Sequence, residues 1–238
     1  MYTCRYLVLL FLSVYFSFSS SVSASQDTST LAEKIYVKND RLFFRGEITH
    51  DSINYAFSEI EKYKGNIRYM TVKSQGGDII PAMQLGRWIY DHDIALTVDQ
   101  CFSSCANYFF TAAASVHINK GAVVGWHGGA LQKNFKPDAD ADSYDWKHWH
   151  TITTLERNFF EHIGVNEDIT IYGQLNDFAL MKAEPSCIEA DKKGHLDGWT
   201  FSIEDLKHFG VNHVSSDNKV PSTDYPNGWT AVCVIPVS

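Results

Sequence analysis

The sequence has little positive charge and no basic run. Its 20 Lys and Arg residues face 28 Asp and Glu residues, which gives a formal net charge of −8. A nucleic-acid binder needs a basic surface to neutralise phosphates, so this balance argues against nucleic acid as a partner. The chain also lacks internal repeats and an obvious linker, and its 45% hydrophobic and 20% charged residues are ordinary for a globular protein. These features exclude a disordered or fibrous chain and predict one folded domain.

One long apolar run, residues 6–18, lies near the N-terminus. It follows the positive charge of Arg5 and precedes a Ser-rich tract that ends Val22-Ser23-Ala24. This order is typical of a secretory signal peptide, and the run is shorter than the roughly 20 residues that span a bilayer. We therefore expect residues 1–24 to be cleaved and residues 25–238 to form a single domain. The mature protein is predicted to be exported, periplasmic or secreted, with no stable membrane anchor.

Cysteine is scarce, and one of the five cysteines, Cys4, leaves with the predicted signal peptide. An even number in an exported chain indicates disulfides. Cys101 and Cys105 bracket a Ser-Ser pair, while Cys187 and Cys233 lie in the irregular C-terminal part. We predict the pairs Cys101–Cys105 and Cys187–Cys233 over the crossed alternatives. The competing interpretation is that Cys101 and Cys105 are small buried thiols.

Strand-like and helix-like segments alternate through the first two thirds of the chain. Right-handed βαβ units at this spacing predict an α/β sheet covered by helices on both faces. Beyond about residue 175 the pattern weakens. The predicted strands are 34–37, 42–44, 67–72, 94–98, 116–118 and 123–125, and the predicted helices are about 51–60, 79–90, 101–114, 146–163 and 203–209.

Three motifs follow strands of this predicted sheet, where α/β proteins gather their sites. They contain Gly76-Gly77, the Ser103-Ser104 pair and His127. A serine at a strand-to-helix turn is exposed, and the next N–H points outward as an oxyanion donor. A Gly-Gly turn presents a second N–H, and a neighbouring histidine accepts the serine proton. Together, the three motifs predict nucleophilic catalysis.

These motifs resemble the Clp-type serine peptidases of the Clp/crotonase superfamily, in particular its exported Clp-like branch. The matching segments are Ser74-Gln75-Gly76-Gly77-Asp78, CFSSCANYFFTAAA at 101–114 and GWHGG at 125–129. The resemblance implies Ser103 as nucleophile, His127 as general base, and oxyanion donors from the N–H groups of Gly77 (or Gly76) and Ser104. It also implies a Clp/crotonase-like ββα superhelix with helices packed on a mostly parallel sheet. A peptide or protein substrate and no cofactor are expected, and because the family commonly forms rings, a homo-oligomer is a possible assembly.

Some assignments stay open at this point. Ser104 is a rival nucleophile, although Ser103 is central in the C-x-S-x-C motif. The third triad member is Asp197 if the chain is aligned on its late segment 200–211, with Asp191 nearby, and Asp177 if it is aligned forward from His127.

Other candidate groups have simpler explanations. A related branch pairs serine with a lysine base, but Lys120 and Lys147 have no motif around them. No metal site is expected, because the acidic tract at 138–145 lacks the Gly and Glu of a calcium loop and His148 and His150 face different sides of a helix. Trp146 and Trp149 are expected to pack, not to bind sugars. Acyl-CoA chemistry is disfavoured by export.

The sequence predicts an exported serine hydrolase, in particular a peptidase. The alternative is a catalytically inactive binding or scaffold module on the same fold.

Overall fold

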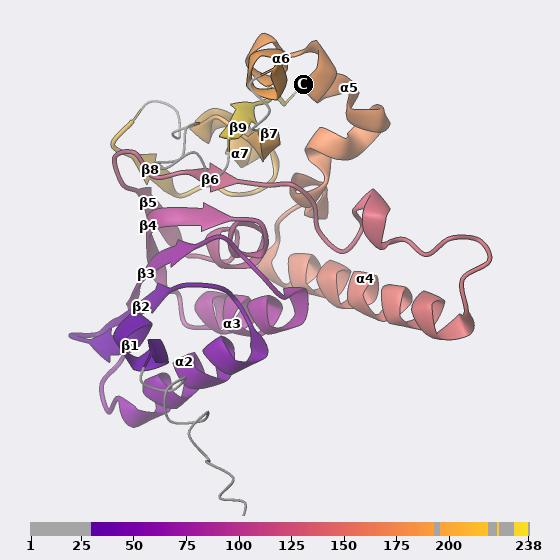
Figure 1. Ribbon diagram of the computed structural model, residues 1–238. Coiled ribbons are helices and arrows are strands. Elements are labelled where there is room, and N and C mark those ends of the chain that lie inside the picture. Colours follow the sequence, from indigo (N-terminus) through magenta and orange to yellow (C-terminus); the bar gives the residue numbers. More distant parts are fainter. Residues whose placement is uncertain (1–29, 193–195, 219–222, 224–230, 238) are drawn as a thin grey trace, which may run out of the picture.

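The computed structural model describes residues 30–192, 196–218, 223 and 231–237, without the side chains of residues 176–178 (Figure 1). The predicted signal peptide lies outside these residues. The strands are β1 (Ile35–Lys38), β2 (Arg41–Arg45), β3 (Tyr69–Ser74), β4 (Ala95–Phe102), β5 (Ser115–Ile118), β6 (Val124–Gly125), β7 (Leu196–Thr200), β8 (Val214–Ser216) and β9 (Ala231–Val234). The α-helices are α2 (His50–Lys62), α3 (Ile79–Asp91), α4 (Ser143–Ile163), α5 (Leu175–Ala183), α6 (Pro185–Lys192) and α7 (Ile203–His208). The short helical turns are η1 (Cys105–Phe110), η2 (Lys133–Phe135), η3 (Glu167–Thr170) and η4 (Tyr172–Gln174).

The sheet begins with a β-hairpin formed by the first two predicted strands. Strands β1 and β2 pair antiparallel around Asn39 and Asp40. Both turn residues have positive φ, +49° and +59°, as a two-residue type I′ turn requires. The hairpin therefore follows from the Asn-Asp sequence.

The remaining strands of the main sheet are parallel. The order is β1-β2-β3-β4-β5-β8, and β6 pairs with β4 beyond the end of β5. Helices α2 and α3 connect β2 to β3 and β3 to β4, as the alternating pattern predicts. The prediction of an α/β protein with helices on a mostly parallel sheet is confirmed.

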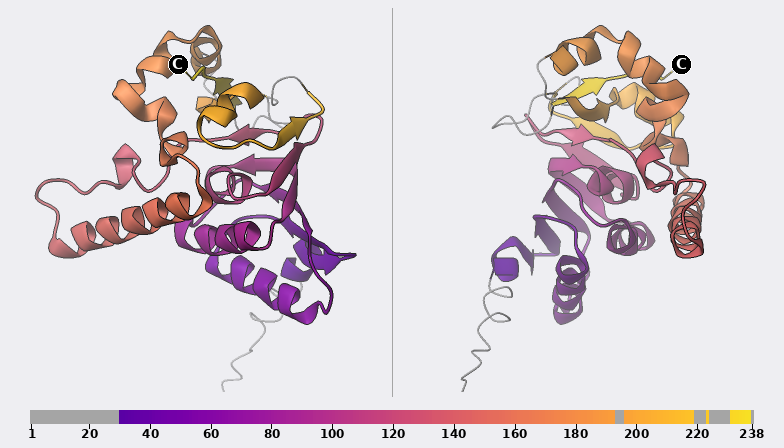
Figure 2. Two further views of the ribbon diagram at one scale, coloured as in Figure 1. Left: turned by 180° about the vertical axis from the view of Figure 1, so that it is seen from behind. Right: turned by 45° about the vertical axis from the view of Figure 1, so that its right-hand side comes forward.

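Within the described residues, helices cover one face of strands β2–β4 and leave the other face open. Figures 1 and 2 show α2 and α3 on the same side of β2–β4. The prediction of helices on both faces is wrong for these strands, because their other side chains are not apolar enough to require a second layer. On that face Arg41 donates hydrogen bonds to Thr71 and Thr97 (3.0 and 3.2 Å), and Phe43 is half-buried. The covered face carries Leu42, Phe44, Met70, Val72, Leu96 and Val98.

The C-terminal part contains elements that the sequence pattern does not reveal. Helices α5 and α6 precede β7, which pairs in parallel with β9 to form a small second sheet. The Cys187–Cys233 disulfide joins α6 to β9, as predicted. One continuous buried cluster extends from Ile35 to Ile235 and connects this part to the main sheet. Within the described ranges no helix has the length and apolar character needed to cross a membrane.

Candidate active site

Ser103 stands at the sharp turn between β4 and η1. Its φ of +59° lies in the left-handed region that residues other than glycine rarely adopt. The Ser103 N–H donates to the Gly125 carbonyl (3.0 Å), and the Asn107 N–H donates to the Ser103 carbonyl (2.9 Å). This strained strand-to-helix elbow presents the hydroxyl at the sheet edge, as nucleophilic serines require. The predicted helix 101–114 is shorter than expected, since β4 continues to Phe102 and only the π-helix η1 follows.

A disulfide spans this elbow. Cys101 in β4 is joined to Cys105 at the start of η1, and both side chains are fully buried. The structure therefore contains both disulfides that the sequence predicts, and this one ties together the two elements on either side of Ser103.

His127 reaches the serine from the neighbouring strand. Because Phe102 and Gly125 are register partners in β4 and β6, the residues that follow the two strands are neighbours. The Nε2 atom of His127 lies 2.7 Å from the Oγ of Ser103, within the hydrogen-bond reach of about 2.6–3.2 Å that a general base needs. The Phe102 ring stacks on the imidazole, with 5.1 Å between ring centroids. The serine and histidine proposed from sequence are thus in contact.

Asp197 lies close to His127 because the backbone of Trp199, two residues after Asp197, pairs with the backbone of Trp126. Trp126 and Trp199 exchange backbone hydrogen bonds of 2.8 Å in both directions, so β7 runs antiparallel beside the His127 segment. Burial lowers the pKa of His127 from its ordinary value of 6.5, while the charge of Asp197 acts in the opposite direction and raises it. Within the described residues no hydrogen bond joins Asp197 to the imidazole, so its influence is electrostatic.

The other two candidates for the third position are placed differently. Asp191 lies near the end of α6 and is exposed, as Asp197 is, but it is not among the charges that shift the pKa of His127. Asp177 belongs to α5, and its side chain lies outside the described residues. Asp197 is the candidate whose charge reaches His127.

The Gly76-Gly77 turn lies against the serine elbow. A Cβ on Gly76, whose φ is +95°, would stand 2.6 Å from the Ser103 Cβ, so no other residue fits this contact. The Gly76 N–H donates to the Ser74 Oγ (3.1 Å). In contrast, no hydrogen bond within the described part of the chain uses the N–H of Gly77 or that of Ser104. Of the two glycines, Gly77 therefore has the free donor.

The rival catalytic groups are poorly placed. The Ser104 hydroxyl is buried and has no hydrogen-bond partner among the described residues. Lys120, in the turn before β6, and Lys147, on α4, are both exposed. In the acidic tract, Asp142 caps α4 by accepting hydrogen bonds from the backbone N–H groups of Tyr144 and Asp145.

Side chains from three elements hold the loop that carries His127. The Asn107 Nδ2 donates to the Gly128 carbonyl (2.8 Å), and the Gln174 Nε2 donates to the carbonyl of His127 itself. These contacts fix the backbone immediately after the imidazole.

Glu156 on α4 is fully buried and is the third side chain that holds this loop. Its Oε2 accepts the Ala130 N–H (2.8 Å), and its Oε1 accepts the Tyr108 hydroxyl (2.6 Å). Burial raises the pKa of Glu156 above its ordinary value of 4.5, although both hydrogen bonds oppose this shift. Glu156 was not among the site residues proposed from the sequence. A signal was present, since Glu156 interrupts an apolar stripe formed by Ile152, Phe159 and Ile163.

No protein-family model matches the chain, and a search of curated proteins finds no match.

Proposed function

We propose that this protein is an exported serine hydrolase, in particular a peptidase, of the Clp/crotonase type. The observation that carries the proposal is the contact of 2.7 Å between the Ser103 Oγ and the His127 Nε2 at a left-handed elbow. Strain at a non-glycine residue is costly, at about 1–3 kcal/mol, and is concentrated at functional sites.

In this proposal Ser103 attacks the substrate carbonyl carbon while His127 takes the hydroxyl proton. The N–H groups of Gly77 and Ser104 stabilise the oxyanion, a contribution of about 3–4 kcal/mol per donor. The leaving amine receives the proton from His127, which leaves an acyl-enzyme on Ser103. A water molecule then gives a proton to His127 and attacks the ester, which releases the acid and restores the serine. Asp197 stabilises the imidazolium form in both halves of the cycle.

The fold supports the Clp/crotonase assignment without establishing it. The Gly-Gly turn, the serine elbow and the histidine follow β3, β4 and β6, in the order that the resemblance implies. Two cavities meet at Gly77, one lined by charged residues and the other by apolar residues such as Ile79 and Phe135. Space on both sides of the oxyanion turn suits an extended substrate such as a peptide. The two disulfides support a site of action outside the reducing cytoplasm.

A fluorophosphonate probe tests the proposal. The wild type is expected to be labelled at Ser103, and labelling is expected to be lost in Ser103→Ala and in His127→Ala, because both act as a unit. Ser104→Ala is the matched control and is expected to keep its label. A labelled Ser103→Ala protein, or a wild type that is not labelled at all, would contradict the proposal.

The second candidate is an inactive binding module on the same fold. The observation in its favour is that no hydrogen bond orients the imidazole through Asp197 within the described residues. A folded wild type that is unreactive toward the probe supports this candidate.

A further inference from the structure

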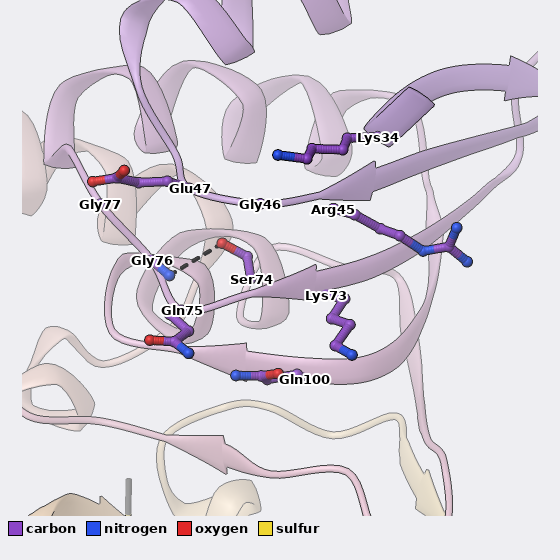
Figure 3. A pocket seen from close by; sticks show the side chains of 10 residues that line it. All are labelled: Lys34, Arg45, Gly46, Glu47, Lys73, Ser74, Gln75, Gly76, Gly77 and Gln100. Carbon is purple, nitrogen blue, oxygen red and sulfur yellow. Dashed lines mark hydrogen bonds between the residues drawn. The ribbon is translucent and has the colours of Figure 1, made fainter. Parts of the chain in front are cut away.

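A cavity of about 760 Å³ lies at the carboxyl ends of β2, β3 and β4 (Figure 3). Three cationic side chains, those of Lys34, Arg45 and Lys73, line it, with Glu47 as the one lining carboxylate. The chain as a whole carries a formal charge of −8, so this cavity is a local reversal of sign.

Two of the cations are neighbours on the sheet, and the Arg45 guanidinium also lies over the Phe43 ring, 5.8 Å from its centroid. Arg45 and Lys73 are register partners on neighbouring parallel strands, and their side chains therefore leave the same face of the sheet. Like charges in this relation destabilise a sheet. Among the described residues no carboxylate forms an ion pair with Arg45, Lys73 or Lys34. Figure 3 shows the Glu47 carboxylate at the Gly77 end of the cavity, whereas the Arg45 and Lys73 head groups lie at the other end.

The cavity adjoins the serine elbow through Gly76. Gly76 and Gly77 form part of its wall, and Gly76 lies directly against Ser103. A substrate chain held at Ser103 and crossing this turn therefore enters the cavity and passes toward Arg45 and Lys73.

We infer that this cavity is a substrate subsite that binds a carboxylate, and that the protein acts on acidic peptides. The inference rests on the proposed peptidase function. A bound carboxylate relieves the repulsion between Arg45 and Lys73, and the planar guanidinium of Arg45 suits a carboxylate. The carboxylate belongs either to an Asp or Glu side chain or to the C-terminus of a peptide.

The test compares matched quenched-fluorescent peptides that differ only by Asp/Asn and Glu/Gln exchange, each made as a C-terminal acid and as an amide. At low salt we expect kcat/KM to be higher for the carboxylate form, and the difference to shrink as salt rises. The acid/amide pairs show whether the C-terminus or a side chain supplies the group. Equal rates for all forms would overturn the inference.

Substitutions in the cavity test whether its cations cause the preference for peptides with a carboxylate. Lys73→Gln is expected to lower kcat/KM for the acidic peptide about two- to fivefold, and Lys73→Glu by more, with little change for the neutral peptide. The matched control is Lys38→Glu, which makes the same charge change on an exposed residue at the opposite edge of the sheet. A Lys38→Glu effect equal to that of Lys73→Glu would reject the cavity as the cause.

Two further readouts separate this inference from the proposed function. Labelling of Ser103 by the uncharged fluorophosphonate, which is expected to be unchanged in Lys38→Glu, reports the reactivity of the serine without a peptide substrate. If Ser103 is not labelled in any protein, the peptidase proposal fails. In that case the binding of acidic and neutral peptides to Ser103→Ala, measured by fluorescence anisotropy, still decides whether the cavity selects carboxylates.

Discussion

At the scale of single residues, two opposing influences set the protonation of His127. Burial lowers its pKa from 6.5, and Asp197 raises it, with burial the larger influence. The neutral imidazole is the form that accepts the serine proton. The wild type should therefore lose activity on acidification with a midpoint below pH 6.5.

The first residue-scale prediction concerns a variant that lacks the Asp197 carboxylate. In Asp197→Asn the pKa of His127 falls further, so the acid limb of kcat/KM moves to lower pH, while kcat decreases because the imidazolium loses its counter-charge. Stopped assays from pH 4 to 8 measure both effects. Asp191→Asn is the control, with an exposed carboxylate on the same C-terminal part of the chain. A shift of the acid limb in Asp177→Asn or Asp191→Asn, and not in Asp197→Asn, would assign the third position to another residue.

The second residue-scale prediction concerns Glu156. Because its pKa is raised on folding, the native state holds the proton more tightly than the unfolded chain, and stability is lost as pH rises from about 4.5 through the folded pKa. Glu156→Gln leaves one of its two donors without an acceptor, which costs about 1–3 kcal/mol, but it removes this pH dependence.

Thermal unfolding of the wild type and Glu156→Gln across pH 4–8 tests the Glu156 prediction. The stability advantage of the wild type is expected to shrink as pH rises. An advantage that grows with pH would show that Glu156 is stabilised as the ion. The exposed Glu161→Gln on the same helix is the control and is expected to have no such effect.

At the scale of elements, the two disulfides are expected to differ in their effects on stability and on the reactivity of Ser103. By loop entropy, the Cys187–Cys233 bridge stabilises by about 4 kcal/mol and the short Cys101–Cys105 bridge by about 2 kcal/mol. The short bridge, however, spans the serine elbow. Urea unfolding and fluorophosphonate labelling rates of the two double Cys→Ala variants separate stability from reactivity.

We expect loss of Cys187–Cys233 to cost more stability, and loss of Cys101–Cys105 to slow labelling more among molecules that remain folded. Equal labelling rates in the two folded variants would show that the short bridge has no part in positioning Ser103.

Elements with strong local signals were predictable from sequence, and those formed by distant contacts were not. The strands predicted at 34–37 and 42–44 and the helix predicted at 79–90 have local signals, and they appear as β1, β2 and α3. Strands β7 and β9 pair across a long stretch of chain and carry no clear alternation. Helices α5 and α6 have weakly amphipathic sequences and depend on contacts with β9 and the Cys187–Cys233 bridge.

At the scale of the whole molecule, the same distinction explains the site. Ser103 and His127 could be placed together from sequence because parallel strands end at one edge. Asn107, Glu156 and Gln174 could not be linked to His127, since their contacts depend on how α4 and η4 return to the sheet. Asp197 could likewise be preferred over Asp177 and Asp191 only from the Trp126–Trp199 contact, because no local sequence pattern indicates that contact.

That contact between Trp126 and Trp199 also has a consequence for biosynthesis. A chain is made from its N-terminus, so the serine elbow and the histidine loop exist well before β7 is available to lie beside them. The strand that brings Asp197 to His127 is in turn paired with β9, which is made later still. A chain that ends before β9 therefore holds Ser103 and His127 without a paired β7 beside them, and we expect the charge of Asp197 to reach His127 only after β9 has been made.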